Sequence, residues 1–198
     1  MGFPSNYSFG LCRLATLALY VALFCGNAIA QFDIKPIERY ELVSTRGSIL
    51  NEKQAESRWW LMYLGSSRCG ERCRIPLRLM QGMMEALNFW ERRQLSAALL
   101  SVEPRIDDVA KLQDYLLAHR PHVQGLTGSS FNINIAAKAL GVAGSDVCRT
   151  DANVAGSEDM HLAQIYLVMP GGKLVTTWHE STPVSVAVKQ LRVLMANN

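Results

Sequence analysis

The stretch that most constrains the fold is the unbroken apolar run "RWWLMYLG", Arg58–Gly65. A strand with one face in solvent alternates apolar and polar residues, and this run does not alternate. It therefore predicts a central strand that is buried on both faces, which is typical of a sheet covered by helices on each side. A second run, "SAALLSV" (Ser96–Val102), predicts another buried strand.

The segments around these two runs predict an alternation of strands and helices. Two short strands are expected in Tyr40–Leu50 around a Thr-Arg-Gly turn, and a hairpin in His161–Trp178 around its Pro-Gly-Gly turn. A short strand is expected in "VQGLTG". Helical spacing of apolar residues predicts helices from Pro76 to Trp90, Asp107–His119, Ser129–Gly141 and Ser181–Met195, the last capped by Ser181 or Thr182. This order predicts an α/β, thioredoxin-like fold, in which helices flank a central mixed sheet that carries an N-terminal β-hairpin.

The N-terminal segment is typical of a signal peptide. Arg13 precedes an apolar run from Leu14 to Phe24, and Ala28-Ile29-Ala30 forms an A-x-A cleavage site. The apolar run is short for a membrane span, so a retained membrane anchor is the alternative. We therefore expect a signal peptide over residues 1–30 and one domain over residues 31–198. The protein is expected to be exported, either periplasmic or anchored to the membrane facing the periplasm.

The net charge and the number of cysteines limit the classes of protein to which this chain can belong. The formal net charge is +3 and the basic residues are scattered among acidic ones, which gives no support to a nucleic-acid-binding role. Removal of the signal peptide leaves Cys69, Cys73 and Cys148, an odd number that does not indicate a disulfide-stapled domain. A domain of this length buries a core without disulfides, so these cysteines are available for chemistry.

Cys69 and Cys73 lie between the first buried strand and the next helix, where α/β proteins usually place their sites. The helix N-terminus and the neighbouring arginines favour thiolates, although those arginines can equally be a solvated surface. Dithiol exchange usually has two residues between the cysteines, and here there are three. Thiolates select Cu(I) or Zn, but a Zn site needs four ligands. Spacing alone leaves a structural disulfide, a redox pair and half of a metal site open.

Three of the four histidines are candidates for a ligand role, and they fall into two groups. His119 and His122 flank a proline in an expected loop, which favours a surface position over a ligand role. His161 stands at the entrance of the predicted hairpin, after a polar loop long enough to reach the cysteine end of the sheet. From its position alone, a lone histidine is more often structural than a ligand.

Four segments of the chain resemble the SCO/SenC family: "YLGSSRCGERC", "LLSVEPRIDD", "LTGSS" and "HLAQIYLVMPGGKLV". The resemblance implies an exported thioredoxin-fold protein that delivers copper to the CuA site of cytochrome c oxidase. It implies that Cys69, Cys73 and His161 bind copper, as Cu(I) with Cu(II) as the alternative. The implied partners are the copper-bearing subunit of cytochrome c oxidase, or another copper protein, and a thiol reductant.

Three positions depart from the usual pattern of that family. Gly70 and Arg74 stand where similar proteins have prolines, and Met160 stands where an aspartate often precedes the histidine. A thioether from Met160 can bind Cu(I), although a core methionine is the more common role. Cys148 is expected to be an isolated thiol, with a fourth sulfur ligand or a resolving cysteine as the alternative.

The acidic segment "SVEPRIDD" has two interpretations. The resemblance matches Glu103 and Asp107 to an acidic loop that approaches the site. Capping of the next helix by Asp107 or Asp108 explains these residues almost as well.

Two other functions use the same cysteines. A thiol-disulfide oxidoreductase would cycle Cys69 and Cys73 between dithiol and disulfide, and would reduce the cysteines of a partner protein or a peroxide. A copper- or redox-sensing regulator would act through protein contacts. His161 favours copper, because thiol exchange does not require it.

Overall fold

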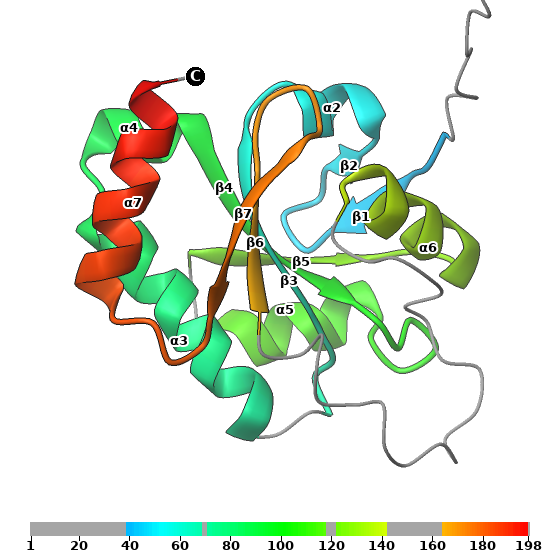
Figure 1. Cartoon of the computed structure of the whole chain (residues 1–198). Helices are drawn as coiled ribbons and strands as arrows, with labels where there is room; N and C mark the ends of the chain where they lie inside the picture. Colours follow the sequence, from blue (N-terminus) through cyan, green and yellow to red (C-terminus); the bar gives the residue numbers. More distant parts are fainter. Residues whose placement is uncertain (1–38, 69–70, 118–121, 142–163, 198) are drawn as a thin grey trace, which may run out of the picture. The chain divides into compact units, whose positions relative to one another are not determined.

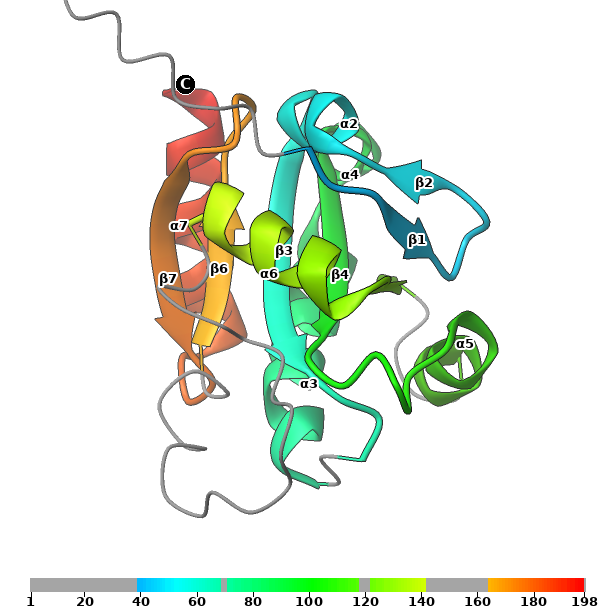
Figure 2. The same cartoon turned by 90° about the vertical axis from the view of Figure 1, so that its right-hand side faces the viewer.

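The computed structural model describes residues 39–68, 71–117, 122–141 and 164–197, within the compact unit that begins at Glu38. In these residues the strands form one sheet in the order β2-β1-β5-β4-β3-β6-β7 (Figure 1). Their bounds are β1 Leu42–Ser44, β2 Ile49–Leu50, β3 Trp59–Gly65, β4 Leu95–Ser101, β5 Val123–Thr127, β6 Gln164–Val168 and β7 Leu174–His179. Strands β3, β4 and β5 are parallel, whereas β1 and β6 join them antiparallel. The predicted mixed sheet is confirmed, and Figure 2 shows β7 and the β1–β2 pair at its opposite edges.

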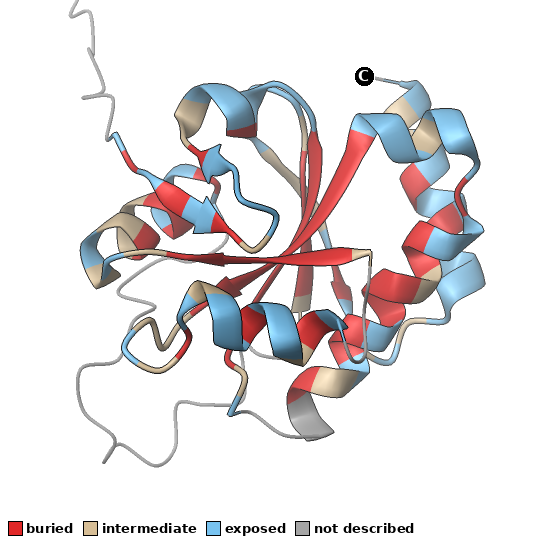
Figure 3. Cartoon of the chain, turned by 180° about the vertical axis from the view of Figure 1, so that it is seen from behind, coloured by how far each residue is buried: buried red, intermediate tan, exposed pale blue. Residues whose placement is uncertain are grey.

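Both predicted buried strands are confirmed, since every residue of β3 and β4 is buried (Figure 3). Consecutive side chains of β3 enter different cores because a strand points them alternately to its two faces. Tyr63 belongs to the core beneath helices α3, α5 and α7, and Leu64 belongs to the core beneath α2 and α6. The helix bounds are α2 Glu52–Glu56, α3 Glu71–Ala86, α4 Phe89–Gln94, α5 Val109–Leu117, α6 Ser130–Ala139 and α7 Val184–Ala196.

The expectation of one continuous helix up to Trp90 is wrong. Helix α3 ends at Ala86, and the Asn88 side chain then accepts hydrogen bonds from the backbone N–H groups of Trp90 and Glu91, which starts α4. Such a local cap stabilises a new helix start in competition with continuation of the old helix. Trp90 is 70% exposed, so it does not extend the buried face of α3.

Three local details also differ from the sequence-based expectations. Pro76 lies inside α3, and Pro183 itself is the N-cap of α7, without a side-chain hydrogen bond. Helix α2 was not predicted, because its five residues are too few to show a helical period; its start is a capping box between Asn51 and Gln54.

The predicted turns are present. Gly47 has a φ of 79°, and Gly171 and Gly172 have φ of 92° and 76°, a region in which glycine has no steric penalty. Across the described ranges, none of the helices has both the length and the apolar character that crossing a membrane requires.

Candidate metal centre

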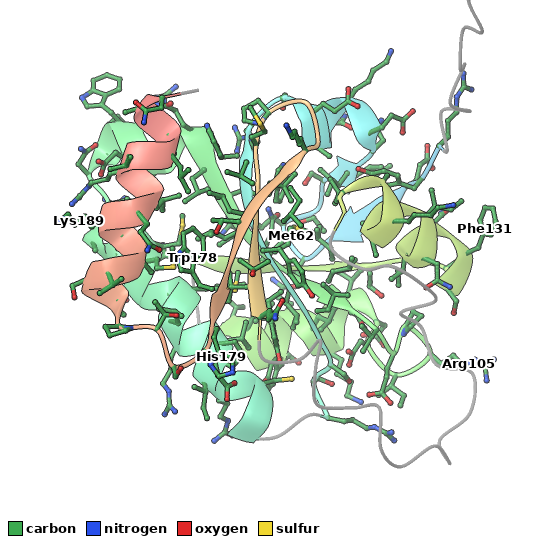
Figure 4. All side chains as sticks on the ribbon, viewed as in Figure 1. Met62, Arg105, Phe131, Trp178, His179 and Lys189 are labelled. Atoms are coloured by element: carbon green, nitrogen blue, oxygen red, sulfur yellow. The ribbon has the colours of Figure 1, made fainter. Side chains whose placement is uncertain are left out.

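The candidate site lies where the parallel strands of the sheet, including β3, have their carboxyl ends. We call this line of strand ends the carboxyl edge, to distinguish it from the outermost strands. Gly65 ends this strand in register with Ser101, which ends the parallel strand β4. The start of β6 reaches the same edge, because Ile165 pairs with Tyr63 on the other side of β3. Strand β7 ends there too, at His179 (Figure 4). The fold therefore brings the segment just before the cysteine loop and the start of β6, the strand that follows His161 in the sequence, to the same carboxyl edge.

Cys73 lies in the first turn of α3 and has no exposed surface. The fully buried Tyr63 hydroxyl donates a hydrogen bond to its Sγ at 3.0 Å. Cys73 is disulfide-bonded, and its partner lies outside the described residues, among which Cys73 is the one cysteine. The sulfur is thus held between a helix start, which favours negative charge, and a hydroxyl donor.

The Tyr63 hydroxyl keeps its proton over the physiological pH range. Burial raises the pKa of Tyr63 well above its usual value, and the nearby Tyr115 and Glu180 raise that pKa further. A protonated phenol is a hydrogen-bond donor, whereas a phenolate is not. Tyr63 therefore remains a donor to the sulfur of Cys73.

Because Gly65 has no side chain, the Sγ of Cys73 can pack closely against it. A Cβ atom added at this position would lie 3.0 Å from the Sγ of Cys73, 2.8 Å from Cε1 of Tyr63 and 3.1 Å from Cδ1 of Leu99. These distances are shorter than ordinary van der Waals contacts, so a side chain at position 65 would displace its neighbours. The glycine permits close approach of α3 to the end of the strand.

The acidic segment approaches the cysteine loop, as expected from the resemblance. The buried carboxylate of Asp107 accepts hydrogen bonds from the backbone N–H and the hydroxyl of Ser67 and from the hydroxyl of Ser101. Arg68 forms an ion pair with Glu103 at 2.9 Å. Asp107 does not cap the next helix; Asp108 does, by accepting from the N–H of Lys111 at 2.8 Å.

Several predicted site residues lie outside the described residues: Cys69, Cys148, Met160, His161 and His119. His122 is described and immediately precedes the amino end of β5, at the edge of the sheet opposite the cysteine loop, where its N–H donates to Gln81. This position separates His122 from the cysteine loop. Within the described ranges, no three side chains of the metal-binding types come close enough to hold an ion.

Sequence reasoning overlooked Tyr63, Ser67 and Ser101 at this edge. For Tyr63 the sequence did contain a signal, because side chains alternate along a strand. Tyr63 and Gly65 therefore lie on the same face of β3, toward the helix that follows the cysteines. His179 was also overlooked. Its Nδ1 accepts from the backbone N–H of Ser181 at 3.3 Å, which gives it a role in the turn after β7.

The chain matches the family model described as SCO1/SenC over residues 30–196. A protein of Stutzerimonas stutzeri, named "Putative copper-binding protein", is 28% identical over 165 residues, which cover 82% of this chain and 79% of that protein.

Solved structures of similar proteins share the fold. Yeast Sco1 with copper bound superposes with a TM-score of 0.64 at 21% identity, over 81% of this chain and 92% of that one. BsSco, reported with a disulfide switch as a member of the Sco family of cytochrome c oxidase assembly proteins, has a TM-score of 0.61 at 19% identity, over 79% and 91% of the two chains. At these identities the likeness establishes the fold, and the thioredoxin-like prediction is confirmed.

Proposed function

The chain belongs to the SCO1/SenC family, and from this we propose that it is a metallochaperone for Cu(I) that delivers the ion to the CuA site of cytochrome c oxidase. Copper is the cargo, and the proposed ligands are Cys69, Cys73 and His161. The copper-bound structure of yeast Sco1 and the name of the Stutzerimonas relative support copper as the ion. The description of BsSco supports the oxidase as the destination.

The observation that carries the proposal is the setting of Cys73. Its sulfur is buried at the carboxyl end of a central strand and receives a hydrogen bond from Tyr63. A thiolate is the soft ligand that Cu(I) prefers, and a hydrogen bond from the surrounding shell orients such a ligand. The described part of the donor set therefore fits copper.

Chain length supports the other two ligands. Cys69 directly follows Arg68, whose ion pair with Glu103 lies at this edge. His161 precedes Ile165 by four residues, and Ile165 pairs with Tyr63. Four residues of extended chain span at most about 14 Å, so the chain is long enough for His161 to reach the cysteine loop from Ile165.

The proposed site works by ligand exchange. Two thiolates and one imidazole leave a low-coordinate Cu(I) open to a ligand of the partner protein, so the ion need not be released into solution. The disulfide at Cys73 must first accept two electrons and two protons to give the ligating thiols, which requires a thiol reductant. Export fits this chemistry. We propose that residues 1–30 direct the protein to the periplasm, either cleaved after Ala30 or retained as a membrane tether.

A thiol-disulfide oxidoreductase is the second candidate, and the disulfide at Cys73 favours it. Cys73 has no exposed surface, so a partner thiol or disulfide would have to react with the other sulfur of the pair. In this candidate Cys69 and Cys73 are the catalytic pair.

Copper uptake by the two redox forms separates the candidates. The purified protein without residues 1–30 is titrated with Cu(I) anaerobically, as the dithiol and as the disulfide, against a chromophoric Cu(I) chelator. We expect one Cu(I) per reduced chain, negligible uptake by the disulfide form, and slow reduction of insulin by the dithiol. No uptake by the dithiol, together with rapid insulin reduction, would replace the metallochaperone by the oxidoreductase.

A further inference from the structure

We propose that Asp107 is a positioning residue for the copper site, because its buried carboxylate fixes the point at which the cysteine loop leaves the sheet. This inference rests on the proposed function for the identity of the ligands. The carboxylate holds Ser67, which stands two residues before Cys69. It therefore acts on the cysteine pair through the backbone and not by contact with the ion.

Three donors converge on the Asp107 carboxylate. The backbone N–H of Ser67 donates to its two oxygens at 3.3 and 3.2 Å, and the Ser67 hydroxyl donates at 2.5 Å. The Ser101 hydroxyl, at the end of β4, donates at 2.8 Å. The backbone carbonyl of Asp107 in turn accepts from the hydroxyl of Thr127, which ends β5, at 2.8 Å. Asp107 thus ties the cysteine loop to the ends of two neighbouring strands.

Because Asp107 is buried, its hydrogen bonds favour the one position of the cysteine loop in which Ser67 can donate to the carboxylate. Asp107 and Ser101 have no exposed surface. A buried carboxylate is costly unless hydrogen bonds replace its water, and Ser67 supplies two of the three donors. If Ser67 moved away, the carboxylate would keep only the bond from Ser101 and would be poorly satisfied. The desolvation cost therefore opposes any displacement of the loop.

Neighbouring contacts fix the rest of the segment up to the residue before Cys69. The N–H of Val102 donates to the carbonyl of Gly65 at 3.0 Å, and the N–H of Arg68 donates to the Ser66 hydroxyl at 3.2 Å. On the other side of the loop, Cys73 is fixed by its bond from Tyr63. The loop from Arg68 to Cys73 is therefore held at both ends. This limits the distances that are possible between the sulfurs of Cys69 and Cys73. Such pre-organisation raises affinity because less ordering is required on binding.

Helix capping does not explain the buried carboxylate. Asp108 caps α5, and its exposed carboxylate accepts from Lys111. Asp107 points instead to the cysteine loop, so the two adjacent acids have different roles. Asp108 consequently provides a matched control for the loss of one negative charge.

The test compares Asp107→Asn, Ser67→Ala and Asp108→Asn in the chain without residues 1–30. Two quantities are measured: the Cu(I) affinity of the dithiol by chelator competition, and the reduction potential of the Cys73 disulfide against a thiol redox buffer. We expect Asp107→Asn to weaken Cu(I) binding about 10-fold, in the range of other outer-shell changes. With Cys69 as the proposed disulfide partner of Cys73, a looser loop also lowers the effective concentration of one thiol near the other. The disulfide should then be about 10-fold easier to reduce, a rise of about 30 mV.

Ser67→Ala keeps every charge and removes only one bond to the carboxylate, so we expect shifts in the same directions of about 3-fold. Asp108→Asn should match the parent in both measurements. Ser67→Ala keeps the inference testable if Asp107→Asn does not fold. The inference is overturned if Ser67→Ala matches the parent, whatever Asp107→Asn does, or if Asp108→Asn shifts as much as Asp107→Asn. If the parent itself binds no Cu(I), the proposed function fails, and the reduction potentials still decide whether Asp107 positions the loop.

Discussion

A Cys73→Ser variant is expected to fold like the parent and to bind Cu(I) more than about 100-fold more weakly. The loss should exceed the 10- to 100-fold typical of changes outside the ligand shell, because a ligand itself is removed. The fold should persist, because the serine hydroxyl is smaller than the thiol and can accept the hydrogen bond from Tyr63. Circular dichroism and thermal unfolding check the fold, and anaerobic competition with a Cu(I) chelator measures the affinity.

Cys148→Ser is the matched control for this variant. Cys148 is expected to be an isolated thiol, so its loss should leave the affinity and stoichiometry for Cu(I) at the parent values. Copper binding by a folded Cys73→Ser variant at the parent affinity would remove Cys73 from the ligand set. A loss of binding in Cys148→Ser would show instead that Cys148 supplies a sulfur.

The Gly65→Ala variant is expected to lower the free energy of unfolding by about 1–3 kcal/mol, the usual cost of overpacking a core. The added Cβ would meet three side chains at 3.1 Å or less, those of Tyr63, Cys73 and Leu99. All three belong to the same buried core, so none can move into solvent. For a domain of this size, each 1 kcal/mol lowers Tm by about 2–4 °C. Urea unfolding and calorimetry measure the two quantities.

Gly82→Ala provides the comparison, because Gly82 lies within α3. There the three atoms nearest to the added Cβ would all belong to Val184, the nearest at 3.0 Å, and Val184 is 37% exposed and can adjust. Alanine also gains about 1 kcal/mol over glycine in a helix interior. We expect Gly82→Ala to be at least about 1 kcal/mol more stable than Gly65→Ala. Equal stabilities would show that the close approach of Cys73 to Gly65 does not constrain position 65.

The sheet was predictable from the sequence because β3 and β4 are buried on both faces and therefore consist of unbroken apolar runs. The glycine turns were predictable because positive φ angles favour glycine. The break at Asn88 and the short helix α2 were missed, because each depends on a local cap. A periodic pattern of apolar residues does not reveal such caps.

The position of Cys73 after a buried strand was predictable, but the contacts of its sulfur were not. A tyrosine within an apolar run resembles ordinary core, and only the packing of α3 on β3 brings its hydroxyl to Cys73. Ser67 and Asp107 stand 40 residues apart, so their hydrogen bonds depend on the completed sheet. The ligand roles of Cys69 and His161 stay predictions, because both residues lie outside the described part of the chain.

The Cu(I) affinity of the reduced chain, compared with those of His161→Ala and His122→Ala, tests the proposed copper site most directly. His122 is the matched control because it immediately precedes β5 at the edge of the sheet opposite the cysteine loop. We predict one Cu(I) per parent chain, binding at least about 100-fold weaker in His161→Ala, and the parent affinity in His122→Ala. Binding by His161→Ala as tight as that of the parent would contradict a copper site made of two cysteines and this histidine.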